Sequence, residues 1–229
     1  MSAPGIAGIV LAAGSSSRMG KEKALLPWPA EDSLQTFLGA AIASLRPHSQ
    51  LVIVVAGGNH AALKPVAEAH GAILVENPQP QQGQFTSLKV GLREAMERGC
   101  NTTAIITLVD RPPAQRATIE TLLAALRGGS QGKPAAGQRW AAVPEHGGRH
   151  GHPIVAGREM IAAFLEAPPE STARAVEHAH ASRIAYVPVN DRYVVANINT
   201  LEDYRALLAA ESAGSAAKAS PKAKPKTKQ

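Results

Sequence analysis

Small residues and cations directly follow the first apolar run of the chain, in a pattern that could bind a polyphosphate. The run Ile6–Leu11 is rich in β-branched residues, which predicts a buried strand. Residues 12–14 are Ala-Ala-Gly, and the hydroxyl-rich residues 15–20 carry Arg18, with Lys23 close behind. Backbone N–H groups can approach phosphate only where side chains are absent, so this stretch predicts a phosphate-binding loop.

Two well-known phosphate-binding loops do not fit this stretch. A Walker A loop has four residues between its glycines, whereas five separate Gly14 from Gly20. It also has Ser or Thr after its lysine, whereas Glu22 follows Lys21. A dinucleotide-binding fingerprint needs glycine where Ser16 stands, so the loop is neither a P-loop nor a Rossmann NAD site.

The stretch resembles a longer signature instead. Residues 11–27 read LAAGSSSRMGKEKALLP and match LAAGxSxRMGxxKxLLP, the signature of the nucleotidyltransferases that activate the molybdenum cofactor. The alternative is a plain Gly/Ser connection between a strand and a helix. The resemblance implies a bound nucleoside triphosphate, with Arg18 and Lys23 as catalytic residues. The nucleotide-binding residues that it implies here are Leu11, Ala12, Ala13, Gly14, Ser15, Arg18, Gly20 and Lys23.

A second polar stretch covers residues 77–87 and reads NPQPQQGQFTS. Its simplest interpretation is an exposed connection, because its length is about the upper limit for loops in compact domains. In the resembled family this region reads NPxxxxGxxxSL and lies against the nucleotide base. The resemblance therefore implies that Asn77, Gly83 and Ser87 belong to the nucleotide site.

Asp110 directly follows the apolar run 104–109. A carboxylate at the end of a strand beside a triphosphate loop can hold Mg²⁺, which prefers hard oxygen ligands. The alternative is an aspartate that caps the next helix. In the family the metal-binding aspartate lies in a DxP motif, which Asp110, Arg111 and Pro112 match, so the resemblance implies that Asp110 binds both nucleotide and Mg²⁺.

The second implied Mg²⁺ ligand departs from the family pattern. The family often ends in DxDTPEDY, where the first aspartate binds the metal, but here Asn197 and Asn199 replace both acids. The guanylyltransferase branch uses Asn at this point. Asn197 is therefore a predicted metal ligand, and it should bind Mg²⁺ less strongly than Asp because one formal charge is missing.

Residues 145–153 read EHGGRHGHP and contain three histidines. Zinc binding is disfavoured, because histidines in a glycine-rich loop lack the fixed spacing that preorganises a zinc site. The family has a glycine-rich segment here that approaches the acceptor substrate. The implied acceptor-binding residues are Arg149, Gly151, His152 and Pro153.

The elements that must position these residues alternate along the chain. Strands are predicted at residues 6–11, 51–56, 72–75, 104–109, 184–189 and near 194–197, and helices at 34–45, 60–70, 85–98, 114–127, 158–165, 172–179 and from Thr200. This alternation predicts an α/β fold: a Rossmann-like, mostly parallel twisted sheet with helices on both faces, in three α/β/α layers. Ligands of such sheets bind at the carboxyl ends of the strands.

The composition predicts one domain, residues 1–211, and a disordered Lys/Ala/Pro-rich tail, residues 212–229. The formal net charge of +6 belongs mostly to this tail, which holds five of the 24 Lys and Arg and no acid. The rest is nearly neutral, so nucleic-acid binding is not expected. With no leader and no run of ~20 apolar residues, a cytoplasmic protein that does not enter a membrane is predicted.

The resemblance implies Mg²⁺-dependent transfer of a nucleotide to the molybdopterin form of the molybdenum cofactor, with release of pyrophosphate. Ala13 favours CTP, because LAAG accompanies CTP and LAGG accompanies GTP in the family, whereas Asn197 is more typical of the GTP-using branch. Two alternatives stay open. One is a sugar-phosphate nucleotidyltransferase of the same fold, and the other is a non-catalytic protein that delivers the cofactor to a molybdenum hydroxylase client.

Overall fold

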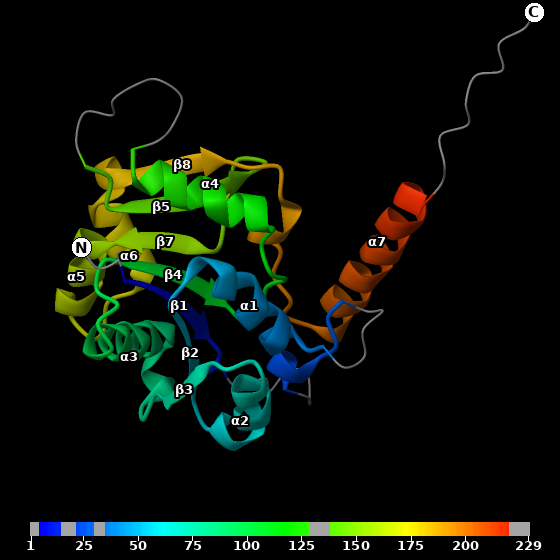
Figure 1. Cartoon of the computed structure of the whole chain (residues 1–229), viewed down its shortest axis with the longest axis horizontal. Helices are drawn as coiled ribbons and strands as arrows, with labels where there is room; N and C mark the ends of the chain where they lie inside the picture. Colours follow the sequence, from blue (N-terminus) through cyan, green and yellow to red (C-terminus); the bar gives the residue numbers. More distant parts are fainter. Residues whose placement is uncertain (1–4, 15–21, 30–34, 129–137, 220–229) are drawn as a thin grey trace, which may run out of the picture.

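The protein is an α/β structure built on one sheet of eight strands (Figure 1). The computed structural model describes residues 5–14, 22–29, 35–128 and 138–219, with side chains through Glu211. Four strands of this sheet are mutually parallel; the first, second and fourth of them are buried along most of their length, and the third, at the edge of the sheet, is only partly buried. They are β1 (Ile6–Leu11), β2 (Leu51–Ala56), β3 (Ile73–Glu76) and β4 (Thr103–Leu108).

The second half of the sheet contains strands that the sequence analysis did not predict. They are β5 (Ala141–His146), β6 (Arg149–His150) and β7 (Ile154–Gly157), while the predicted β8 covers Ile184–Pro188. The sheet order is β3-β2-β1-β4-β7-β5-β6, with β8 also paired to β5. Because β7 is antiparallel to both β4 and β5, the sheet is mixed but mostly parallel, as predicted.

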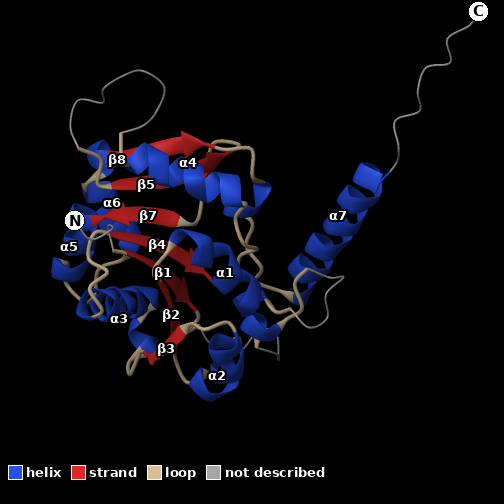
Figure 2. Ribbon diagram, in the orientation of Figure 1, coloured by secondary structure: helices blue, strands red, loops and turns tan. Residues whose placement is uncertain are grey.

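Helices cover both faces of the sheet, which gives the predicted three layers (Figure 2). Val10, Val54 and Ile105 point to one face and pack with the first group of helices. This group is α1 (Phe37–Leu45), α2 (His60–Ala69) and α4 (Arg116–Leu126). Ile9 and Ile106 point to the other face and pack with the second group. This group is α3 (Gln84–Glu97), α5 (Arg158–Glu166) and α6 (Ala173–Ala179).

Glycine brings α3 unusually close to the sheet. A Cβ atom at Gly91 would lie 2.9 Å from side-chain atoms of both Ile9 and Val55. Such a contact is too short for any larger residue, so Gly91 sets the depth at which α3 lies on β1 and β2. The first turn of α3 thereby reaches the carboxyl end of β1, where the predicted phosphate loop begins.

The predicted strand near residues 194–197 is wrong. A 3₁₀ turn covers Arg192–Val195, and the Asp191 carboxylate caps it by accepting a hydrogen bond from the Tyr193 N–H at 3.1 Å. The carbonyls of residues 194–196 accept hydrogen bonds from arginine side chains and, at Val194, from the backbone N–H of His152, and none of them belongs to a strand ladder. Side-chain partners therefore override the β-branched character of Val194 and Val195.

Helix α7 (Leu201–Ala219) extends away from the body in Figure 1. It begins at the predicted residue, because Thr200 Oγ1 accepts from the Asp203 N–H at 3.1 Å and Asp203 Oδ2 accepts from the Thr200 N–H at 2.9 Å. The helix continues past residue 211, where composition placed the domain boundary. None of the described helices is both long and apolar enough to cross a bilayer.

Candidate active site

The predicted phosphate loop and Asp110 meet because β1 and β4 are neighbours in the sheet. Leu11 pairs with Leu108, and the Val109 N–H donates to the Leu11 carbonyl at 3.1 Å. The two strands run in parallel, so the segments that follow them leave the sheet at the same edge. They surround a small hollow lined by Leu11, Gly14, Glu22, Lys23, Gln84, Val109 and Asp110.

The environment of Asp110 suits a metal ligand. Burial raises the pKa of this carboxyl above its usual value, and the positive charges of Arg111 and Lys23 lower it in part. Its Oδ1 atom is buried and has no hydrogen-bond partner among the described residues. A buried carboxylate oxygen without a donor is costly unless a cation compensates it, so Asp110 fits a hard cation such as Mg²⁺.

Asn197 lies close to Asp110 through the backbone. The Ile198 N–H donates to the main-chain oxygen of Asp110 at 2.9 Å, so the residue before Ile198 follows the same edge of the sheet. Among the described residues there is no cluster of three or more His, Cys, Asp or Glu that could hold a metal. The prediction that Asp110 and the exposed Asn197 hold Mg²⁺ requires further oxygen ligands, which phosphates and water commonly supply to this ion.

A second hollow shares Leu11, Gly14 and Gln84 with the first. Its remaining lining residues are Ala13, Pro80 and Ser87. Two predicted base-contacting residues thus lie in it or next to it, since Ser87 lines this hollow and Gly83 lines the neighbouring larger cavity. Gly83 has a φ of 102°, a conformation that glycine adopts without strain, and it immediately precedes α3.

Asn77 lines neither hollow, but its side chain is hydrogen-bonded to residues that do or that lie beside them. Its side chain is buried, and its Nδ2 donates to Thr86 Oγ1 and to Ser87 Oγ, both at 2.9 Å. Its Oδ1 accepts from the Gln79 N–H at 2.9 Å. These bonds tie the two ends of the 77–87 segment together, so Asn77 positions Ser87.

The residues predicted to bind the acceptor hold the segment that leads to Asn197. An Arg149 Nη donates to the Val195 carbonyl at 3.3 Å, and the His152 N–H donates to the Val194 carbonyl at 2.9 Å. A Cβ at Gly151 would lie 2.0 Å from that Val194 oxygen, so only glycine permits the approach. Pro153 is buried beside them. Arg149 remains exposed, and His152 also lines the larger cavity.

Arg111 also holds the segment of residues 194–196, although the sequence analysis assigned it no definite role. Its Nη1 donates to the carbonyls of Val194 and Ala196 at 3.3 and 3.2 Å. Desolvation, with a smaller contribution from the Arg111 charge, lowers the pKa of His152 to about 3. The imidazole is therefore neutral at physiological pH.

The three histidines of residues 145–153 have different surroundings. His146 Nδ1 lies 2.9 Å from the Val189 carbonyl oxygen. The His150 ring stacks on Tyr186 with 4.0 Å between ring centroids, and His152 faces the larger cavity. Among the described residues these histidines belong to no metal-binding cluster.

The larger cavity has a volume of about 300 Å³ and shares Leu11 and Gln84 with both hollows. Its walls are mainly apolar, including Phe85, Phe164 and Leu88. Arg174 and Glu177 reach it from α6. The sequence analysis missed these two residues, because nothing in a short alanine-rich helix indicates that its charged side chains line a cavity. It also missed Gln84, the first residue of α3.

Three predicted site residues, Ser15, Arg18 and Gly20, lie outside the described residues. Their assignment to the nucleotide site stays a prediction. The described part of the phosphate loop consists of its two ends, at Gly14 and from Glu22 onward. Both ends line the hollow that contains Asp110.

A glycine-containing loop and an acidic residue at the carboxyl ends of adjacent parallel strands form a ligand site in the place where α/β sheets bind ligands. Comparison with known families agrees. The chain belongs to the MobA-like NTP transferase domain family, whose model matches residues 8–185. The recognition made from the signature at residues 11–27 is thereby confirmed.

The chain is similar to proteins of both nucleotide branches. It is 26% identical over 160 residues to a molybdenum cofactor cytidylyltransferase of Escherichia coli K12, covering 70% of this chain and 74% of that protein. It is 34% identical over 120 residues to a molybdenum cofactor guanylyltransferase of Xanthomonas euvesicatoria pv. vesicatoria, covering 51% of this chain and 53% of that protein.

The fold comparison gives the same α/β architecture. A solved nucleotidyl transferase structure from Methanothermobacter thermautotroptrophicus superposes with a TM-score of 0.71 at 19% identity, covering 93% of this chain and 100% of that chain. At this identity the match shows the shared fold. The family match, in turn, shows a MobA-like NTP transferase domain, and two of its relatives are molybdenum cofactor nucleotidyltransferases.

Proposed function

We propose that the protein transfers CMP from CTP to the molybdopterin form of the molybdenum cofactor, with Mg²⁺ as its metal and pyrophosphate as the leaving group. The observation that carries the proposal is the shared hollow of Gly14, Lys23 and Asp110. A small-residue loop, a cation and a carboxylate with a buried, unpartnered oxygen are the groups that a metal-bound triphosphate requires.

The chemistry requires positioning and charge compensation rather than a covalent intermediate. An oxygen of the acceptor phosphate attacks the α-phosphorus of CTP, a new P–O bond forms, and the bond to the β-phosphate oxygen breaks. Lys23 would stabilise negative charge at the α-phosphate, and Arg18 would neutralise the leaving pyrophosphate. No general base is required, because the acceptor phosphate is already ionised. Bound Mg²⁺, held by Asp110 and Asn197, would supply further charge neutralisation on the phosphates.

The choice of CTP rests on Ala13, which lines the hollow beside Ser87 and Pro80. A methyl group there reduces the room for a purine. GTP is the second candidate, since Asn197 matches the branch that uses it. A cofactor-delivery protein for a molybdenum hydroxylase is the third, and it would bind nucleotide without releasing pyrophosphate.

The test is pyrophosphate release by the full chain with the molybdopterin-form cofactor and either CTP or GTP. We expect release with CTP and Mg²⁺, no release with chelator, and loss of at least about a hundredfold in Asp110→Ala. Glu97→Ala, which removes an exposed carboxylate at the end of α3, is the matched control and should behave as wild type. Preference for GTP would move the protein to the guanylyl branch, and binding without release would favour the delivery role.

A further inference from the structure

The cavity beside the two hollows combines an apolar wall with two carboxylates, Glu170 and Glu177. Phe85 and Phe164 contribute to the wall, and their rings meet edge to face with centroids 6.2 Å apart. Glu177, on α6, lines the same cavity. Sites for small aromatic ligands have this composition, with apolar faces for the ring and a few polar groups that fix its orientation.

Glu177 is poorly compensated by the protein itself. Desolvation raises the pKa of its carboxyl to about 7, against the smaller opposing effect of the Arg174 charge. Among the described residues, no hydrogen-bond donor reduces this cost. A ligand that donates two hydrogen bonds would do so, because an ionised carboxylate accepts two parallel N–H bonds.

The position of the cavity connects it to the transfer reaction. Leu11 and Gln84 line it and also line the hollow that contains Lys23 and Asp110. A ligand ring in the cavity could therefore extend a phosphate toward that hollow. The volume of about 300 Å³ is sufficient for a two-ring heterocycle and lies at the lower end of typical ligand pockets.

We propose that this cavity holds the ring system of the acceptor, and that Glu177 selects a planar two-ring nitrogen heterocycle with an amino group next to a ring N–H. This assignment rests on the proposed function, because it takes the ligand of the cavity to be the acceptor of the nucleotide. The carboxylate would accept from the amino group and from the adjacent ring N–H. Phe85 and Phe164 would contact the faces or edge of the ring.

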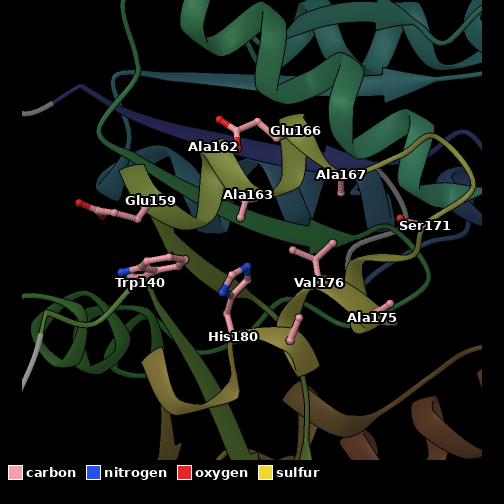
Figure 3. Close-up of a pocket in the computed structure, with 11 residues that line it drawn as sticks. Trp140, Glu159, Ala162, Ala163, Glu166, Ala167, Ser171, Ala175, Val176 and His180 are labelled. Atoms are coloured by element: carbon pink, nitrogen blue, oxygen red, sulfur yellow. The ribbon is translucent and has the colours of Figure 1, made fainter.

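The groove on the outer side of α5 and α6 is a poorer candidate for this ring. Figure 3 shows the Trp140 and His180 rings facing each other at one end of it, with 4.7 Å between their centroids. Alanine and valine side chains occupy its middle, and Glu159 and Glu166 lie along one edge. This groove lacks the lining residues of the hollow around Asp110.

The test uses two free heterocycles as probes, measured by titration calorimetry with the full chain at pH 7.5. Pterin carries the amino group next to a ring N–H, whereas lumazine has a carbonyl in place of the amino group. We expect wild type to prefer pterin, and Glu177→Gln to bind pterin about ten- to a hundredfold more weakly with lumazine unchanged. Glu166→Gln, an exposed carboxylate on α5, is the control and should bind both as wild type.

The pH dependence gives an independent measure. Wild-type affinity for pterin should fall as the pH drops below about 7, because Glu177 becomes protonated, and Glu177→Gln should not show this fall. The other groups that act on Glu177 or share its cavity are Arg174, Tyr186, His152 and Glu170. Only the Glu177 substitution should remove the transition near pH 7.

Three outcomes would overturn the proposal. The first is an unchanged affinity of Glu177→Gln for pterin. The second is an equal loss of affinity for pterin and lumazine in both Glu177→Gln and Glu177→Asp, which would show that Glu177 has a structural role. The third is pyrophosphate release by Glu177→Gln with an unchanged acceptor KM, which would leave the transferase function intact. Pterin binding that depends on Glu177, without any pyrophosphate release, would support the cavity assignment while rejecting the transferase function.

Discussion

The backbone N–H of Ile198 donates a hydrogen bond to the backbone oxygen of Asp110 at 2.9 Å, across 88 positions of the chain. This bond joins the acidic residue that follows β4 to the segment that carries Asn197. The carbonyls just before Asn197 are held by Arg111, Arg149 and the His152 N–H. The predicted metal site is therefore assembled from two distant segments, and its geometry depends on how firmly the later one is held.

Asn197→Asp should strengthen Mg²⁺ binding. The substitution adds one formal negative charge in the segment bonded to the Asp110 backbone, so we expect the Mg²⁺ concentration for half-maximal pyrophosphate release to fall several-fold, or about 1 kcal/mol of binding free energy. Asn199→Asp adds the same charge two residues later, in an exposed position near the start of α7, and is the control. An equal effect of both substitutions would indicate general electrostatics rather than coordination.

Ala13→Gly should shift the nucleotide preference toward GTP. Removing the methyl group enlarges the hollow lined by Ala13, Pro80 and Ser87, so the ratio of kcat/KM for GTP to that for CTP should rise about tenfold. Ala41→Gly removes a methyl from the buried core within α1 instead, so it should lower the melting temperature without changing this ratio. A ratio that does not move in Ala13→Gly would exclude Ala13 as the determinant of base choice.

Gly151→Ala should destabilise the fold by about 2 kcal/mol or more. The new Cβ would lie 2.0 Å from the Val194 carbonyl oxygen, so the 194–196 segment must move. Urea unfolding measures the loss. Gly58→Ala is matched to it, because a Cβ at Gly58 meets no atom within 4 Å, and this variant should retain wild-type stability. A Gly151→Ala protein as stable as Gly58→Ala would show that the segment moves freely.

The ionisation of Glu177 should make stability fall with rising pH. The folded-state pKa of about 7 lies above the usual value of 4.5, so the folded protein binds a proton that the unfolded chain has already lost. The stabilising contribution to the free energy of unfolding is at most about 3 kcal/mol. It is complete below about pH 4.5 and is lost as the pH rises through about 7. Chemical denaturation between pH 5 and pH 8 should show this loss in wild type and a smaller one in Glu177→Gln. Parallel curves for the two proteins would contradict the raised pKa.

The sequence alone determined the parallel half of the sheet. Ile6–Leu11 and Leu51–Ala56 were predicted to the residue, because six-residue apolar runs ending in small residues or glycine are typical of strands buried on both faces. The start of α7 was predicted equally well, since the hydrogen bonds between Thr200 and Asp203 are local. A signature of consecutive residues likewise sufficed to recognise the family.

Only the tertiary structure decided how the second half is arranged. β5 contains Pro144 and β7 has four residues, so their pairing depends on distant partners rather than on their own patterns. Residues 194–196 form no strand because Arg111 and Arg149 bind their carbonyls. The role of Glu177 arises in the same way: its pKa depends on the desolvation that the fold imposes, and no local pattern in α6 encodes that. Local hydrogen bonds and apolar periodicity can be read from neighbouring residues, whereas desolvation and long-range side-chain contacts exist only once the chain has folded.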